Sequence, residues 1–291
     1  MERVAAVIPN LNGAGFVGRC VEAARRAGVD EVVVVDDGSS DASPAEAEAA
    51  GARVVRSRGR GFATAVAAGF AETAQPYVLV LNSDCFVDED AVRRLADTLD
   101  SERELALVGA GLRTPDGAPA KSHGVLVELS GAIRALLTGH SGRRIARLDS
   151  GVQHCEFVPL ACVLARRAAW DSVGGIDTGY VFYFEDYDLC WRVGRAGWRI
   201  AVCWDAGAVH VGGASSSADG QPWLRQYYAS LARYLRKRYP ASWIAFPAVW
   251  LPYAVVQTVR KPHRANDFVG AARAVVLPPL AVGDDVVVRD Q

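Results

Sequence analysis

The first hundred residues alternate between short apolar runs and longer stretches rich in alanine and glutamate. The apolar runs hold mostly Val, Leu and Ile and have the length of strands buried on both faces; they span 4–8, 31–35, 53–56 and 77–81. The stretches between them have helical length and span 16–27, 43–50 and 62–73. Strict alternation with short connections predicts a parallel sheet flanked by helices, with any ligand at the carboxyl ends of the strands.

The pattern is less regular after residue 88. Asp88 is expected to cap a helix over 89–101, and a strand is expected over 105–109. Residues 114–151 are rich in Gly, Ser and Arg and show weak periodicity, which predicts an irregular insertion or an acceptor-side loop. Further strands are predicted over 156–165 and 198–203, and further helices over 166–173 and 186–196.

The chain changes character from Gln221 onwards. Residues 223–239 predict an amphipathic helix with a strongly basic end, and residues 239–259 carry no charge at all. The uncharged stretch is long enough to cross a bilayer, but three prolines interrupt it, and its Trp and Tyr residues suit the headgroup zone. Three readings stay open for 223–264: contact with a membrane surface, a packed helical layer, and a true span.

Composition mainly excludes classes of protein. With 51% hydrophobic and 22% charged residues the chain is globular, and its net charge of −1 gives no reason to expect a nucleic-acid partner. The six cysteines form no CxxC pair, which favours reduced, buried thiols over a zinc site. The first residues lack the apolar stretch of a secretory signal, so a cytoplasmic location is expected. The oligomeric state is left open.

A glycine motif offers one hypothesis about function. Gly13, Gly15 and Gly18 spell GxGxxG, and two aspartates follow about 20 residues later, as in dinucleotide-binding proteins. Residues 9–12, however, separate the glycines from the first strand and place them inside a longer loop. A dinucleotide-dependent oxidoreductase therefore stands as an alternative function.

Polar residues follow the second and fourth predicted strands. Asp36 and Asp37, followed by Gly38, can accept hydrogen bonds from a base and a ribose, although the neighbouring Asp and Ser residues could simply cap the next helix. Asp84, in an Asn-Ser-Asp triplet, can bind Mg²⁺ or Mn²⁺ together with a diphosphate, or can serve only as a turn residue.

A second acidic group lies at a predicted helix start. Glu185 and Asp186 follow several aromatic residues, and partial loss of hydration would raise a carboxyl pKa towards that of a general base. The ordinary alternative is that acids favour helix N-termini and that Asp188 pairs with Arg192. His210 follows a later strand and, taken alone, predicts only a core residue.

Taken in order, these segments resemble family 2 of the inverting glycosyltransferases, which have the GT-A fold. The resemblance covers roughly residues 4–213 and includes a 166–177 segment similar to the family's "RR..F..VGGFD" signature. It implies an α/β fold with a single Rossmann-like nucleotide-binding core over 1–220, divided at about residue 110 into a nucleotide-sugar half and an acceptor half. Residues 221–291 would form a C-terminal helical extension.

The resemblance also implies roles for individual residues. Asp186 would be the catalytic base, with Glu185 as the alternative, and Asp84 and His210 would hold a divalent cation, Mg²⁺ or Mn²⁺. The residues implied to bind the nucleotide sugar are Pro9, Asn10, Asn12, Asp36, Asp37, Gly38, Arg58, Gly61, Phe62, Asn82, Ser83 and Asp84.

Three positions depart from the family pattern. Asn82 replaces the first acid of the DxD motif, Val66 and Ala67 replace asparagines, and residues 159–161 replace a small Gly-Ala pair on the acceptor side.

The implied reaction is inverting transfer of a rhamnose-like sugar from a nucleotide-diphosphate donor to a glycan or lipid-linked acceptor, as in bacterial cell-wall or surface-polysaccharide synthesis. It would take place in the cytoplasm, at the inner face of the plasma membrane if 223–264 contacts it. A degenerate protein that binds nucleotide sugars without turnover is a further alternative, suggested by Asn82.

Overall fold

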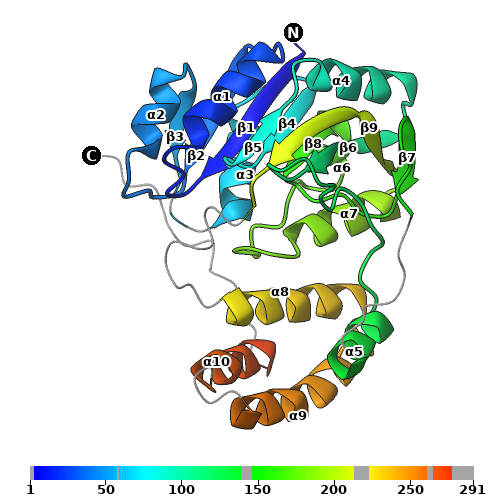
Figure 1. Cartoon of the computed structure of the whole chain (residues 1–291). Helices are drawn as coiled ribbons and strands as arrows, with labels where there is room; N and C mark the ends of the chain where they lie inside the picture. The colour runs from blue at the N-terminus through cyan, green and yellow to red at the C-terminus, as the bar shows by residue number, and fades with distance from the viewer. Residues whose placement is uncertain are drawn as a thin grey trace.

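A nine-stranded mixed sheet forms the centre of the molecule in the computed structural model (Figure 1). The structure describes residues 3–57, 59, 61–138, 146–212, 223–260 and 265–276. The strands are β1 Val4–Asn10, β2 Glu31–Asp36, β3 Arg53–Arg56, β4 Tyr77–Leu81, β5 Cys85–Val87, β6 Leu105–Arg113, β7 Val152–Cys155, β8 Cys162–Arg166 and β9 Arg199–His210. Their order is β3-β2-β1-β4-β8-β6-β9-β5, and β7 pairs with β9.

The parallel arrangement predicted for the first hundred residues is confirmed. Strands β1 to β4 are mutually parallel, and their register sets Asn10 of β1 opposite Asp36 of β2. Side chains of these strands alternate between two hydrophobic clusters: Val7, for example, joins one and Ile8 the other. The polar residues after β1, β2 and β4 therefore emerge at the same edge of the sheet.

The second half of the sheet departs from the mostly parallel expectation. Strand β8 runs antiparallel to β4 on one side and to β6 on the other, whereas β6 and β9 are parallel. The strand predicted over 156–165 begins too early: only its last four residues lie in β8, and β7, which precedes the predicted range, pairs with a different neighbour, β9. Pro159 lies between β7 and β8 and cannot donate a ladder hydrogen bond, which explains the interruption.

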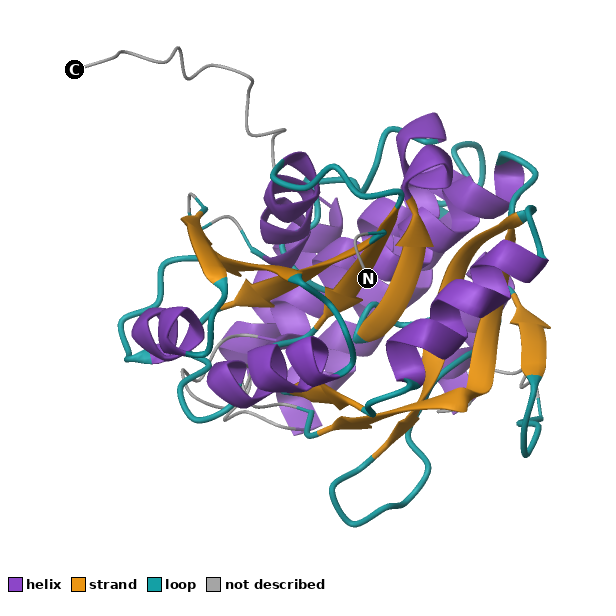
Figure 2. Ribbon diagram, turned by 90° about the horizontal axis from the view of Figure 1, so that it is seen from above, coloured by secondary structure: helices purple, strands orange, loops and turns teal. Residues whose placement is uncertain are grey.

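Helices cover both faces of the sheet (Figure 2). On one face lie α1 Val17–Arg26, α2 Ser43–Ala49 and α4 Ala91–Ser101, whose apolar residues share a hydrophobic cluster. On the other lie α3 Phe62–Ala71, α6 Arg167–Ser172 and α7 Glu185–Arg195, which share the second cluster. The prediction that Asp88 caps α4 is wrong: its carboxylate accepts a hydrogen bond from Arg113 of β6 at 2.9 Å, and α4 begins only at Ala91.

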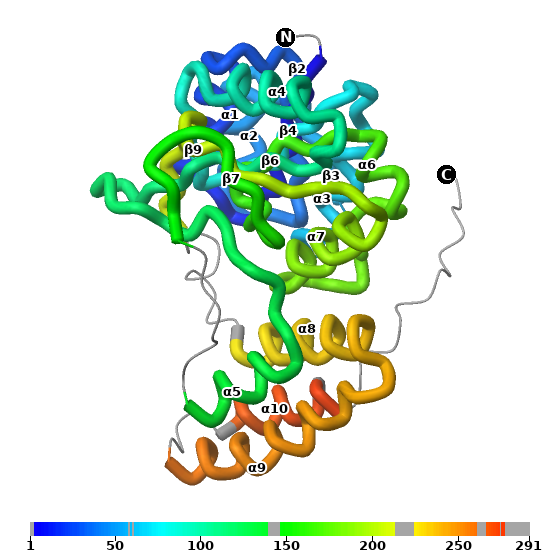
Figure 3. The backbone as a smooth tube through the Cα atoms, turned by 90° about the vertical axis from the view of Figure 1, so that its right-hand side faces the viewer, coloured from blue at the N-terminus to red at the C-terminus, as the bar shows by residue number. Residues whose placement is uncertain are grey.

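A further layer of helices packs beyond α7 (Figures 1 and 3). It consists of α5 Leu129–Thr138, α8 Trp223–Arg238, α9 Ala245–Arg260 and α10 Ala265–Val276. Helix α5 falls inside the stretch predicted to be irregular. Buried side chains of α8 and α9, such as Leu235 and Trp250, join the same cluster as Phe184, so this layer is packed onto the sheet half of the molecule.

Two further predictions from the sequence, on the cysteines and on a membrane span, can be compared with the structure. All six cysteines are free, and every one except Cys155 is buried, as expected for reduced structural thiols. Within the described ranges, no helix combines the length and the apolar character that crossing a membrane requires. The division at residue 220 remains a prediction.

Candidate active site

The ends of β1 and β2 form a hydrogen-bonded polar cluster. Asn10 is almost fully buried, and its Nδ2 donates to Ser43 Oγ at 2.8 Å and to Ser39 Oγ at 3.2 Å. The Asn10 Oδ1 atom is buried with no hydrogen-bond partner in the described part of the chain. A buried acceptor without a donor is costly, so this oxygen is available to a bound ligand or a water molecule.

The loops after β1 and β2 are fixed to each other. Asn12 has a left-handed backbone, with a φ of 50°, and its Oδ1 accepts from the Ser40 amide at 2.9 Å. Gly38, with a φ of 97°, makes the turn that an L side chain rarely adopts. Pro9 lies within β1, buried and opposite Val35. These predicted residues therefore shape the edge of the sheet where a nucleotide is expected.

Asp37 connects this edge to helix α3. Its Oδ2 accepts from the Gly61 amide at 2.8 Å, and its Oδ1 accepts from the Ser57 hydroxyl. A carboxylate has about four acceptor positions, so two internal bonds leave room for a ligand donor. Asp36 is also buried. Arg58, predicted to bind the nucleotide sugar, falls outside the described residues.

The GxGxxG glycines are used for packing. The amides of Ala14 and Gly15, which would have to face a pyrophosphate, donate instead to Asp41 at 2.9 Å and to Glu46 at 2.7 Å. A Cβ atom on Gly13 would lie 2.3 Å from Asn10 Oδ1. Because two carboxylates already occupy these amides and would repel phosphate, the geometry does not support the dinucleotide alternative.

Gly61 joins the nucleotide side to the segment that precedes α7. Its φ is 97°, and a Cβ atom there would lie 2.3 Å from the carbonyl oxygen of Val181. The next amide, that of Phe62, donates to the same oxygen at 2.9 Å, and the Phe62 ring lies 6.0 Å from that of Phe182. A glycine at this position is therefore required by both conformation and space.

Asp84 and His210 meet at the end of β4. Antiparallel pairing of β5 with β9 sets Cys85 opposite His210, so that His210 Nε2 lies 3.3 Å from Asp84 Oδ1 and 3.2 Å from Asn82 Nδ2. The other Asp84 oxygen accepts from the Gly212 amide at 3.0 Å. Burial alone would raise the pKa of Asp84, but the hydrogen bond and charge of His210 outweigh it, and the pKa is lowered.

These residues supply part of a metal site. Among the described residues, no three His, Cys, Asp or Glu side chains gather as a candidate metal cluster. Asp84 and His210 nevertheless offer one carboxylate and one imidazole, and Mg²⁺ commonly uses one or two carboxylates together with substrate phosphates and water. The donor set therefore fits a divalent cation whose remaining ligands come from a diphosphate. Ser83, buried beside them, lies close to Gly13.

The predicted catalytic pair begins α7 after a strained turn. Tyr183 and Phe184 both have a left-handed backbone, with φ values of 69° and 65°. Glu185 is buried, and burial followed by the charge of Asp186 raises its pKa well above the ordinary value. Its Oε2 atom is buried and has no partner in the described structure.

Asp186 is the more accessible of the two acids. It is half-buried, and burial raises its pKa to about 6, against the opposing effects of the Tyr187 amide and the charge of Lys121. The Tyr187 amide donates to Asp186 Oδ1 at 2.8 Å, which leaves Oδ2 for another partner. A carboxyl group with this pKa is suited to accept a proton near neutral pH.

A buried ionic network behind the catalytic pair was only partly foreseen. Asp188 is fully buried and accepts from Arg192 Nε at 2.7 Å, which confirms that predicted pair. It also contacts Lys237 of α8, whose ammonium group lies 2.8 Å from Asp177. Burial opposes ionisation of Asp177, yet Lys237, the Gly179 amide and Arg233 hold its pKa at about 2. Helix α8 is thereby fixed to α7.

The structure brings most predicted residues into two groups. The nucleotide-side residues are connected through Asp37, Gly61 and Val181 to the turn before Glu185. Within the described chain, no hydrogen bond or ion pair joins the Asp84–His210 pair directly to Glu185 or Asp186. A substrate lying between the groups would have to bridge them.

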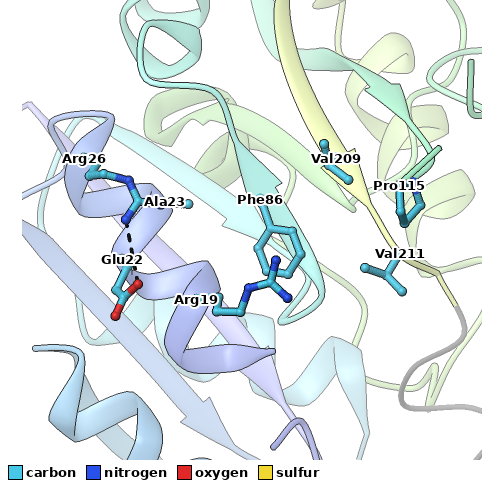
Figure 4. A pocket seen from close by; sticks show the side chains of 8 residues that line it. All are labelled: Arg19, Glu22, Ala23, Arg26, Phe86, Pro115, Val209 and Val211. Carbon is cyan, nitrogen blue, oxygen red and sulfur yellow. Dashed lines mark ion pairs between the residues drawn. The ribbon is translucent and has the colours of Figure 1, made fainter. Parts of the chain in front are cut away.

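A surface hollow lies next to this site and is separate from it (Figure 4). It has a volume of about 410 Å³, and its lining includes Val209 and Val211, which flank His210 in the sequence at the end of β9. The guanidinium of Arg19 lies 4.5 Å from the Phe86 ring centroid at its edge. None of the predicted site residues lines this hollow, so it is not the candidate active site.

Comparisons with known proteins agree with this geometry. A relative from Mycobacterium tuberculosis (strain ATCC 25618 / H37Rv), N-acetylglucosaminyl-diphospho-decaprenol L-rhamnosyltransferase, is 28% identical over 244 residues, which are 75% of this chain and 78% of the relative. The mannosyltransferase PcManGT from Pyrobaculum calidifontis, solved with GDP-Man and Mn²⁺, has a similar structure with a TM-score of 0.59 at 15% identity, covering 94% of this chain and 87% of its own.

A second solved structure, glucosyl-3-phosphoglycerate synthase from Mycobacterium tuberculosis, has a TM-score of 0.53 at 22% identity and covers 79% of each chain. These likenesses confirm the predicted GT-A fold. The model of the family described as "Glycosyl transferase family 2" matches residues 5–172, more than half of the sequence. The chain therefore belongs to glycosyl transferase family 2 and is a glycosyltransferase.

Proposed function

We propose that this glycosyltransferase moves a sugar, rhamnose or a similar hexose, from a nucleotide-diphosphate donor to a hydroxyl of a glycan or lipid-linked acceptor, with inversion at the anomeric carbon. The similar mycobacterial protein is named as an L-rhamnosyltransferase of a diphospho-decaprenol acceptor and supports this substrate class. The single observation that carries the mechanism is the half-buried Asp186, whose pKa is raised to about 6. The segment before it is fixed to the nucleotide side, because the Val181 carbonyl accepts a hydrogen bond from the Phe62 amide, next to Gly61.

Donor binding is assigned to the edge formed by β1, β2 and β4. Asn10 Oδ1 has no internal partner and the Asp37 carboxylate has free acceptor positions, so both can receive donors from the base or ribose. The diphosphate would lie towards Asp84 and His210, with Asn82 and Ser83 beside them. A divalent cation held there would neutralise charge on the departing diphosphate.

The proposed chemical step is one displacement. The acceptor oxygen forms a bond to the anomeric carbon while the bond from that carbon to the diphosphate oxygen breaks, and the electron pair of the broken bond leaves with the nucleotide diphosphate. Asp186 accepts the proton of the attacking hydroxyl through its free carboxylate oxygen. The strained Tyr183–Phe184 turn would orient this carboxylate.

The rate of transfer is expected to depend on the ionisation of Asp186. Only the carboxylate accepts a proton, so kcat/KM should rise as the pH passes the pKa of about 6 and then level off. A pH series of initial rates at fixed ionic strength measures this, with unfolding followed in parallel to confirm that the fold persists. A rate that does not change across that pH range would contradict the assignment of the base.

The donor and the metal are tested together by thermal unfolding with a panel of nucleotide-diphosphate sugars, each with Mg²⁺, Mn²⁺ or chelator. A true donor at about 100 times its Kd should stabilise the fold by about 2.7 kcal/mol and raise the midpoint. Asp84→Asn should remove the cation-dependent part of the increase, whereas Asp90→Asn, on the exposed start of α4, should not.

Two results would overturn parts of this proposal. If no nucleotide sugar raises the midpoint, the donor class is wrong, and if chelator leaves the increase unchanged, the metal is not required. Release of nucleotide diphosphate in the presence of acceptor separates a working transferase from a protein that only binds the donor.

A further inference from the structure

Helix α9 is the outermost helix of the layer beyond α7, and both views place it farthest from the sheet (Figures 1 and 3). One side of it packs inwards. Phe246 and Trp250 are fully buried there, next to α8 and α10, and Ala254 lies one turn further along. This side alone accounts for the attachment of α9 to the protein.

The opposite side of α9 is also apolar. Its exposed positions repeat with helical spacing over four turns: Ile244 just before the helix, then Ala248, Pro252, Val255, Val256 and Val259. Ile244, Val255 and Val259 are 66%, 65% and 76% exposed. A helix on the surface of a soluble protein normally places polar residues on this side, and a helix that is apolar all round is normally covered.

The charges of α8 and α9 indicate what kind of surface covers the exposed apolar face of α9. From Trp223 to Arg260 the chain contains six basic residues and no acidic one. Arg233 and Lys237 are used internally by Asp177, but Arg260 is exposed at the end of α9. Arg236 stacks at 4.1 Å on the ring of Trp243, which precedes α9.

We propose that the exposed face of α9 lies on an anionic lipid surface, with its valines among the acyl chains near the headgroups and with Arg260 and Arg236, the arginine beside Trp243, at the phosphates. At about 1.5 Å per residue, its 16 residues extend about 24 Å, which suits a helix lying along the surface. Tryptophan and arginine at one end match the headgroup zone.

A second copy of the chain is the other partner to consider for an apolar face. A two-fold interface would set this face against itself and bring Arg236 and Arg260 of one copy towards those of the other, with no acidic residue from α8 or α9 to offset them. A negatively charged bilayer instead attracts the same residues. This inference does not depend on the proposed donor or acceptor.

The test uses the full chain and phosphatidylcholine vesicles with and without phosphatidylglycerol, in a flotation assay without donor. The wild type should float with the anionic vesicles and float less with the neutral ones or at high salt. Val255→Asp/Val259→Asp should weaken binding to anionic vesicles at least about tenfold. Leu148→Asp/Val152→Asp, which changes two exposed apolar residues outside the helical layer in the same way, should bind as the wild type does.

Cooperative thermal unfolding of both double variants without donor, with a midpoint close to that of the wild type, establishes that they are folded. If the first double variant is not folded, Val259→Asp alone, at the most exposed position, replaces it. Wild-type protein that stays unbound with anionic vesicles would overturn the proposal, as would equal binding by the two double variants. A lipid-free dimer that Val255→Asp/Val259→Asp dissociates, without any vesicle binding, would assign the face to a second copy instead. None of these readouts changes if the proposed donor is wrong.

Discussion

Replacing Asp186 with asparagine is expected to lower the rate of sugar transfer by about 10²- to 10⁴-fold, the usual contribution of a positioned general base. The amide has nearly the same shape, and its oxygen can still accept from the Tyr187 amide, which now donates to Asp186 Oδ1 at 2.8 Å. The amide nitrogen, however, cannot accept the proton of the acceptor hydroxyl. The loss should therefore appear in kcat, with donor affinity retained.

Glu185→Gln is the matched control, because Glu185 adjoins Asp186 on the same helix turn. The Glu185 carboxyl is buried, and burial raises its pKa, which favours the neutral acid over the carboxylate, so a neutral amide should change the rate far less. Initial rates and donor-induced thermal stabilisation of both variants decide between them. A large loss in Glu185→Gln with near-normal transfer by Asp186→Asn would make Glu185 the base.

Local sequence patterns predicted the first half of the fold well. A strand buried on both faces leaves a continuous apolar run, so β4 was predicted with the bounds that it has in the structure. The bounds of β3 were also predicted correctly, but β3 is the edge strand, and its Arg53 and Arg56 are exposed, so the prediction that it is buried on both faces is wrong. The polar residues after β1, β2 and β4 then had to emerge at one edge of the sheet. The roles of individual residues came from the resemblance to the family, because the hydrophobic periodicity of a segment does not indicate what its polar residues bind.

The parts that were missed depend on contacts between distant segments. The antiparallel direction of β8 is set by its two neighbours, β4 and β6, and leaves no mark in its own sequence. Asp88 looked like a helix cap because a cap has a local signature, whereas its actual partner, Arg113, lies on another strand. Proximity of Lys237 to Asp188 likewise follows from how α8 packs on α7.

That last contact leads to the largest expected effect on stability. Asp188→Asn is expected to lower the free energy of unfolding by about 3 kcal/mol, because it leaves buried positive charge without its carboxylate. Asp188 is fully buried and pairs with both Arg192 and Lys237. Its partners keep other contacts, Arg192 with the Val173 carbonyl at 2.8 Å and Lys237 with Asp177, which sets the loss at the lower end of the range for broken buried pairs.

Asp90→Asn provides the matched comparison, since Asp90 also pairs with the Nε atom of an arginine one helical turn away, at 2.6 Å, but on the surface. Its unfolding midpoint in urea should hardly move, because exposed pairs are screened by water. Adding Lys237→Met to Asp188→Asn should recover part of the lost stability by removing the uncompensated ammonium group. Equal midpoints for Asp188→Asn and Asp90→Asn would show that the network does not hold α8 against α7. Other contacts would then have to stabilise the strained turn before Asp186.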